Sequence, residues 1–164
     1  MAEFVTVVGA VASVTQLLAN CKRLADFVSK VIREAGAQES VKALRADIES
    51  LSAEVKLVDA KCTKAQQPSS PFRIGQSVLD MVETEKLLCQ ETLLELEELL
   101  AKVSGGSLNP SSLARYMQGI LTTLRSSRVE DLQKRVTKHQ QQLHFYVTLI
   151  SEYAVLFHKS DFAD

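Results

Sequence analysis

The sequence predicts an all-α fold: an antiparallel helical bundle of about five helices, several of them long, in one domain over residues 1–164. Three observations predict it. Apolar residues recur at steps of three and four through nearly the whole chain, which is the helical period. The breaks between these runs are short, so consecutive helices are expected to run antiparallel. Turn formers are few, with 6 Gly and 3 Pro, whereas an all-β sandwich needs many turns.

The composition excludes several classes of protein. Hydrophobic residues make up 46% of the chain, which is enough for a core and argues against disorder. The net charge of −1 lacks the basic excess of a nucleic-acid-binding protein, so no nucleic-acid partner is expected. Cys21, Cys62 and Cys89 are odd in number and widely spaced, which is typical of a reducing compartment without a disulfide framework. We therefore expect a cytoplasmic protein.

The first two apolar runs predict two long helices. One covers about residues 3–35 and ends at Gly36, because glycine readily takes the left-handed conformation that closes a helix. The second run extends from Val41 to Cys62. The segment 65–71, Ala-Gln-Gln-Pro-Ser-Ser-Pro, then breaks the helical pattern.

Three further runs complete the predicted bundle. They cover about residues 79–103, 113–124 and 129–157. Lys86 interrupts the first of these stripes and His139 the last. We interpret His139 as a core histidine with a hydrogen-bond partner rather than as a metal ligand. A capping box, Ser127-Arg-Val-Glu130, is expected to start the last helix.

The first and last predicted helices are apolar on more than one face. We expect them to be the most buried elements and to pack against each other, or else to form a partner site. From Phe4 to Cys21 the chain carries no charge over 18 residues, which as a helix is roughly 27 Å long. That length is slightly short of a bilayer's hydrocarbon core. The residues favour a helix buried in protein, with membrane entry as a conditional alternative.

Charge is distributed unevenly between the helices. Residues 66–104 hold three basic and seven acidic side chains, and residues 105–164 hold seven basic and five acidic ones. The acidic run at residues 91–98 is expected on one exposed helix face. The basic residues of 125–138 either contact anionic lipid or pair with that acidic helix within the fold. The candidate interaction-surface residues are Glu95, Glu97, Glu98, Arg128, Lys134 and Arg135.

No catalytic constellation is found in the sequence. The glycines form neither a nucleotide-binding loop nor a nucleophile elbow. His139 and His144 are five residues apart, whereas metal-binding pairs on one helix need a spacing of three or four. The glutamates of 91–98 have no Glu-x-x-His partner motif for a di-iron bundle. We therefore expect no enzyme activity, no metal and no cofactor.

The opening of the chain, Met1 to Leu17, resembles the start of fungal HeLo-like N-terminal effector domains. These domains open with an apolar helix of small residues that contains a glycine and ends in Gln-Leu or Leu-Leu. The residues that match this opening are Gly9, Ala12, Ser13, Gln16 and Leu17. A Leu-aromatic-Val stretch at Leu24–Val28 and a heptad-like helix from Val41 to Val58 follow in the same order.

The resemblance implies a helical bundle similar to the four-helix domain of the mixed-lineage kinase-like necroptosis pseudokinase. It implies programmed cell death, of the kind seen in heterokaryon incompatibility and innate immunity, by pore formation or membrane disruption. A receptor module, C-terminal or in trans, would oligomerise the chain, and the segment 1–21 would leave the bundle for the anionic plasma membrane. The candidate insertion residues are Phe4, Val5, Val7, Val8, Gly9, Val11, Val14, Leu17 and Leu18.

A different function remains open from the residues alone. The bundle can instead be a homotypic interaction or adaptor module of an immune-type receptor, with no direct membrane activity. That hypothesis predicts self-association without lipid through the charged candidate surface. A purely structural helical spacer is a third possibility.

Overall fold

Five helices make up the computed structural model, which describes residues 2–36, 38–70, 73–108 and 113–160, with side-chain surroundings given within residues 14–154. The helices are α1 (Ala2–Ala35), α2 (Glu39–Gln66), α3 (Gln76–Val103), α4 (Leu113–Leu124) and α5 (Ser127–Ser160). The described residues contain no strand. The predicted all-α helical bundle is therefore confirmed.

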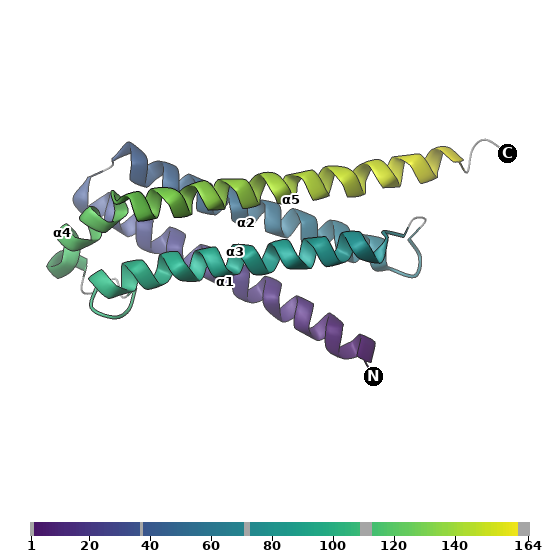
Figure 1. Ribbon diagram of the computed structural model, residues 1–164, viewed down its shortest axis with the longest axis horizontal. Helices are drawn as coiled ribbons and strands as arrows, with labels where there is room; N and C mark the ends of the chain where they lie inside the picture. The colour runs from purple at the N-terminus through teal and green to yellow at the C-terminus, as the bar shows by residue number, and fades with distance from the viewer. Residues whose placement is uncertain (1, 37, 71–72, 109–112, 161–164) are drawn as a thin grey trace.

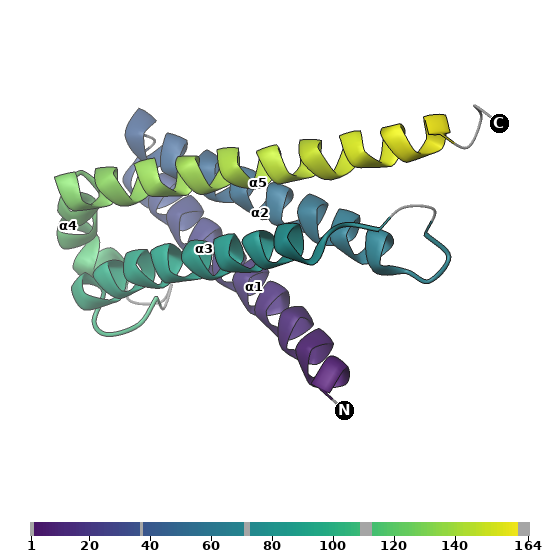
Figure 2. The same ribbon diagram turned by 45° about the vertical axis from the view of Figure 1, so that its right-hand side comes forward.

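Four long helices form the body of the bundle, and the short α4 closes one end (Figure 1). α2 packs against α1 and α5, and α3 packs against the same two helices from the other side. Consecutive long helices run in opposite directions, so α1 and α3 lie side by side and parallel, as do α2 and α5 (Figures 1 and 2). α1 and α5 are therefore diagonal to each other.

The diagonal placement corrects one expectation. We expected the first and last helices to pack against each other, because both are apolar on more than one face. Each instead contacts α2 and α3, so its wide apolar face is divided between two neighbours. In α1 this wider face buries Leu24, Phe27 and Val31 in addition to the row formed by Cys21, Ala25 and Val28.

The core follows the helical period closely. Every residue of the stripe predicted for α2 is buried: Val41, Leu44, Ile48, Leu51, Val55, Val58 and Cys62. The α3 stripe and the α5 stripe from Val129 to Ile150 also face the core, and they carry the two interrupting residues, Lys86 and His139, inward with them. Further along the predicted α5 stripe, Tyr153 is 45% exposed, and the side chain of Phe157 lies outside the described residues. The spacing of apolar residues thus fixes which face of each helix is buried.

Two turns show why the helices end where they do. Gly36 has a φ of 84° and ends α1 as predicted. After α3, Gly105 has a φ of 84°, and a Cβ atom placed there would lie 3.0 Å from the ring of Tyr116. The turn therefore requires glycine both for its backbone conformation and for the close approach of that ring.

The cap of α5 differs from the prediction by one residue. The backbone N–H of Val129 donates to Oγ of Ser126 at 3.4 Å, so Ser126 rather than Ser127 is the capping side chain. Glu130 does not complete a capping box. Its carboxylate instead accepts a bond from Lys134 Nζ at 2.9 Å, one turn along the helix.

The core predicts a contrast between two leucines of α3. Leu96 is fully buried and Leu94 is 43% exposed. We expect Leu96→Ala to lower the free energy of unfolding by about 2–5 kcal/mol, because it removes buried apolar surface and leaves a cavity. Leu94→Ala, which removes the same atoms from an exposed site, should cost less than about 1 kcal/mol. Urea unfolding followed by circular dichroism measures both, and equal losses would contradict the packing.

Candidate functional site

The predicted membrane-insertion segment forms the first half of α1. Its backbone is helical, and in both views the first turns of α1 lead away from α2, α3 and α5 (Figures 1 and 2). The side chains of residues 1–13 are outside the described part of the structure. The insertion candidates that fall in this undescribed set are Phe4, Val5, Val7, Val8, Gly9 and Val11.

The second half of the same segment belongs to the bundle core. Val14 is 6% exposed and Leu17 only 1%, while Leu18 is half-buried. Cys21, at the end of the uncharged run, is also buried. Residues 2–21 are thus one continuous helix, and within it the side chains of Val14, Leu17 and Cys21 lie in the core.

A polar link ties α1 to α3 just after this segment. Arg23 Nη2 donates to Oδ1 of the buried Asn20 at 2.7 Å and to Oε2 of Glu97 on α3 at 2.9 Å. Nδ2 of Asn20 is buried without a hydrogen-bond partner. The charged head of Arg23 thereby connects the two helices at the level where α1 has entered the core.

No helix in the described part of the chain is long and apolar enough to cross a membrane.

The acidic residues of α3 point in three different directions. Glu95 binds Arg135 of α5 at 2.6 Å and also pairs with Arg128 of α5. Glu97 binds Arg23 of α1, and Glu98 binds Lys102 within α3 at 2.9 Å. The predicted single exposed face is therefore wrong: the side chains of Glu95 and Glu97 are only 28% and 22% exposed.

The basic residues of α5 divide in the same way. Arg128 and Arg135 are engaged with α3 inside the fold, which is one of the two alternatives that the sequence left open. Lys134 pairs with Glu130 on its own helix, and this hydrogen bond raises the pKa of Lys134 and lowers that of Glu130. Only the pairs of Arg128 and Arg135 with Glu95 join α5 to α3 among these contacts, and such exposed pairs each stabilise by less than about 1 kcal/mol.

The two polar residues in the apolar seams both have partners. Lys86 has only 4% of its side chain exposed, and its Nζ pairs with Glu83 and lies 3.9 Å from Oδ1 of Asp59 on α2. His139 is a core histidine with hydrogen-bond partners, as predicted. Its Nε2 lies 2.9 Å from Oγ1 of Thr92.

His139 also belongs to a cluster that the sequence analysis missed. Its Nδ1 lies 2.6 Å from Oε1 of Glu85, and Cys89 completes a group whose ligand atoms are all within 4.8 Å of one another. A pair of histidines on one helix can be recognised from its spacing in the sequence, whereas this group joins α3 to α5. The sequence did contain a signal for this group. Glu85 and Cys89 are four residues apart on α3, and the apolar stripe of α5 contains His139.

The three cysteines are free and buried, as expected for a chain without disulfides. Burial raises the pKa of Cys21 to about 12 and that of Cys62 to about 11, because the thiolate would lose its hydration. Burial, together with the charge of Glu85, also raises the pKa of Cys89 well above its usual range. At neutral pH these groups are thiols that behave as small apolar side chains.

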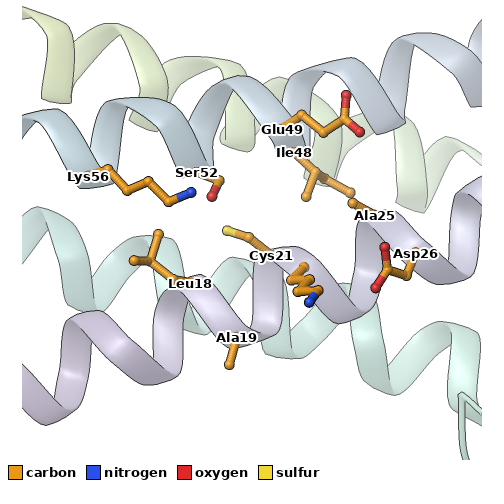
Figure 3. A pocket seen from close by; sticks show the side chains of 10 residues that line it. Leu18, Ala19, Cys21, Ala25, Asp26, Ile48, Glu49, Ser52 and Lys56 are labelled. Carbon is orange, nitrogen blue, oxygen red and sulfur yellow. The ribbon is translucent and has the colours of Figure 1, made fainter.

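Two surface hollows lie along α1. One, of about 510 Å³, separates α1 from α2, with Cys21 at its floor and Lys56 and Glu49 on the α2 side (Figure 3). Another, of about 470 Å³, follows α1 and is lined by Lys22, Arg23 and other charged residues. Both are open grooves with mixed charge, and neither brings several polar groups of one kind toward a common point.

Comparison of the chain with protein-family models, with curated proteins and with solved structures found no match.

The buried thiols predict a loss of stability at alkaline pH. Above about pH 9 the unfolded chain releases thiol protons that the folded chain retains, because the folded pKa values are raised from 9.0. The free energy of unfolding should therefore be independent of these groups below pH 9 and fall as the pH rises toward 11. Urea unfolding across this range measures the effect.

Cys62→Ala separates the thiol from the lysines and tyrosines that also titrate in this range. The variant lacks one raised pKa, so its unfolding free energy should fall less steeply than that of the natural chain. A constant difference between the two proteins from about pH 8 to pH 11 would contradict the assignment.

Proposed function

We propose that this chain is a membrane-targeting effector domain that disrupts or perforates membranes once oligomerised, in a cell-death response of the kind the opening residues suggest. One observation carries the proposal: α1 is a single helix that joins an uncharged N-terminal stretch to a core-bound half. The resting chain would be cytoplasmic and would move to the plasma membrane when a receptor module assembles it.

An uncharged stretch is what membrane entry requires. A charged side chain at the bilayer centre costs ~2.5–3.5 kcal/mol on insertion scales, and residues 4–21 contain none. Gly9, Ala10, Ala12 and Ser13 are small, so neighbouring copies of the helix can approach closely. These features support an assembly of several inserted helices.

The burial of Val14 and Leu17 limits how much of α1 is free to move. Exposing each buried Val or Leu of α1 costs about 1.5–3 kcal/mol, and a whole domain is stable by only about 5–15 kcal/mol. Releasing all of α1 would therefore unfold the bundle. We infer that the mobile part ends before Val14 and that the rest of α1 stays in the core.

Residues 2–13 are too short to span a bilayer alone. Twelve residues of helix are roughly 18 Å long, whereas the hydrocarbon core is about 30 Å thick. The segment would instead lie in the interface or line one leaflet of a pore formed by several copies. Anionic lipid is the expected surface, because Lys134 and Lys138 remain exposed on α5.

The alternative, a homotypic interaction module, has one specific observation in its favour. Four large apolar side chains of α3 are exposed: Leu87 by 57%, Met81 by 50%, Leu94 by 43% and Leu88 by 42%. Leu87 and Leu94 are seven residues apart and so share a helix face. A second copy of the chain docked on that face would cover them without any lipid.

Dye release from anionic liposomes distinguishes the two functions. The full chain should release dye, and the double variant Val7→Asp/Val11→Asp should release little, because two buried charges oppose insertion by several kcal/mol. Thr63→Asp/Gln66→Asp is the matched control. It adds the same two charges at exposed sites of α2, so release should be close to that of the natural chain.

Folding and self-association are measured beside the release assay. Circular dichroism is recorded for both charged variants, and dye release is compared between proteins that keep the helicity of the natural chain. Absence of release at concentrations where the natural chain self-associates would refute the membrane function. If Leu87→Asp then abolished the self-association, the interaction module would be supported instead.

A further inference from the structure

One face of α3 carries three polar side chains toward α5. Glu85, Cys89 and Thr92 are at positions i, i+4 and i+7, so they lie in one row on the helix. His139 of α5 lies opposite this row and contacts both ends of it. Only 12% of the Glu85 side chain and 11% of the His139 side chain are exposed, and Cys89 is fully buried.

The hydrogen bonds of Thr92 determine which nitrogen of His139 carries a proton. The Thr92 hydroxyl has one proton, and it donates to the carbonyl of Leu88 at 3.0 Å. Its oxygen is therefore the acceptor at the 2.9 Å contact with His139, so Nε2 carries a proton and donates. This tautomer is inferred from the network, and it leaves the lone pair of Nδ1 directed at Glu85.

A lone pair on Nδ1 is incompatible with a bare carboxylate at 2.6 Å. Two acceptors at that distance repel, so a positive species must lie between Nδ1 of His139 and Oε1 of Glu85. Two species fit that position. One is a proton, which would make a buried imidazolium–carboxylate pair, and the other is a metal ion bound by both atoms.

We propose that Glu85, Cys89 and His139 bind one divalent transition-metal ion of the zinc class, which links α3 to α5. The position of Cys89 favours the metal ion over the proton. Its sulfur lies in the same cluster, but it takes no part in a histidine–glutamate pair. A carboxylate, a thiolate and a neutral imidazole are together the ligand types that Zn²⁺ takes, and a thiolate–imidazole combination disfavours Ca²⁺ and Mg²⁺.

The charges of the site balance when the metal is bound. The thiol of Cys89 gives its proton to solvent and its thiolate binds the ion, while Nδ1 of His139 binds through its lone pair. One carboxylate and one thiolate then neutralise a divalent cation, so no net charge is buried. The requirement to deprotonate a buried thiol means that binding releases a proton.

The surroundings supply the remaining parts of a metal site. A cavity of about 250 Å³ gives room for a water molecule as a fourth ligand. It is lined by Glu85, His139 and Gln142 and also by Leu88, Arg135 and Lys138. Bond lengths of about 2.0–2.3 Å require the Glu85 carboxylate to withdraw by less than about 1 Å from Nδ1. Thr92 would hold the imidazole in its binding tautomer, as an outer hydrogen-bond partner of a metal-bound histidine does.

This proposal is independent of the proposed membrane function, because none of its residues belongs to the mobile end of α1. A bound ion would connect two helices that are otherwise joined by apolar contacts and by the Glu95 ion pairs. Removing the ion should leave the bundle folded but less stable.

Titration of the metal-free full chain with Co²⁺ and Zn²⁺ tests the site. We expect one equivalent of Co²⁺ to produce the near-ultraviolet absorption of a thiolate–cobalt bond, and one equivalent of Zn²⁺ to remove it. Cys89→Ser should abolish that absorption, whereas Cys62→Ser, a change at another buried cysteine, should retain it. If the natural chain, shown to be folded, gives no such absorption, or if it persists in Cys89→Ser, the proposal is overturned.

Two further variants keep the test decisive if Cys89→Ser does not fold. Glu85→Gln keeps the shape of the side chain but removes its charge, and it should weaken Zn²⁺ binding and remove the rise in thermal midpoint that Zn²⁺ gives the natural chain. Thr92→Val leaves all three ligands in place and should weaken affinity by about 10–100-fold. Unchanged affinity in both variants would show that the ion binds elsewhere and would leave a proton between His139 and Glu85.

Discussion

From Val14 to Val31, one face of α1 is buried between α2 and α3, and the other helices are arranged around that contact. Because α1 and α5 are diagonal, α2 and α3 must each present an apolar face to both of them. The short α4 then returns the chain from α3 to α5. The same contact limits which part of α1 can leave the bundle. That part has to lie outside the buried stretch from Val14 to Val31.

That packing also explains why the polar residues in the apolar stripes are buried and have partners. Lys86 and His139 occupy stripe positions, so the fold buries them and must provide partners. Lys86 pairs with the carboxylates of Glu83 on α3 and Asp59 on α2. His139 lies between the hydroxyl of Thr92 and the carboxylate of Glu85. Since buried polar groups without partners cost several kcal/mol, these contacts help to fix how α3 sits against α2 and α5.

The helices were predictable because each has a regular apolar stripe, and because α1, α2 and α3 end at a glycine or proline segment. The α2 stripe matches residue for residue, and Gly36 ends α1 as expected. Which helices touch was not predictable, because periodicity gives a face but not its neighbour. For the same reason the pairing of Glu95 with Arg128 and the meeting of Cys89 with His139 needed the structure: these residues are far apart in sequence and meet only when α3 lies on α5.

Hydrogen–deuterium exchange of the full chain, with and without anionic vesicles, tests the division of α1 at Val14 most directly. The account predicts that residues 2–13 exchange rapidly in solution and become protected on vesicles, while residues 14–31 stay protected in both conditions. Loss of protection in residues 14–31 on vesicles would contradict it, because the core-bound half of α1 would then be leaving the bundle. Protection of residues 2–13 in solution would contradict it equally.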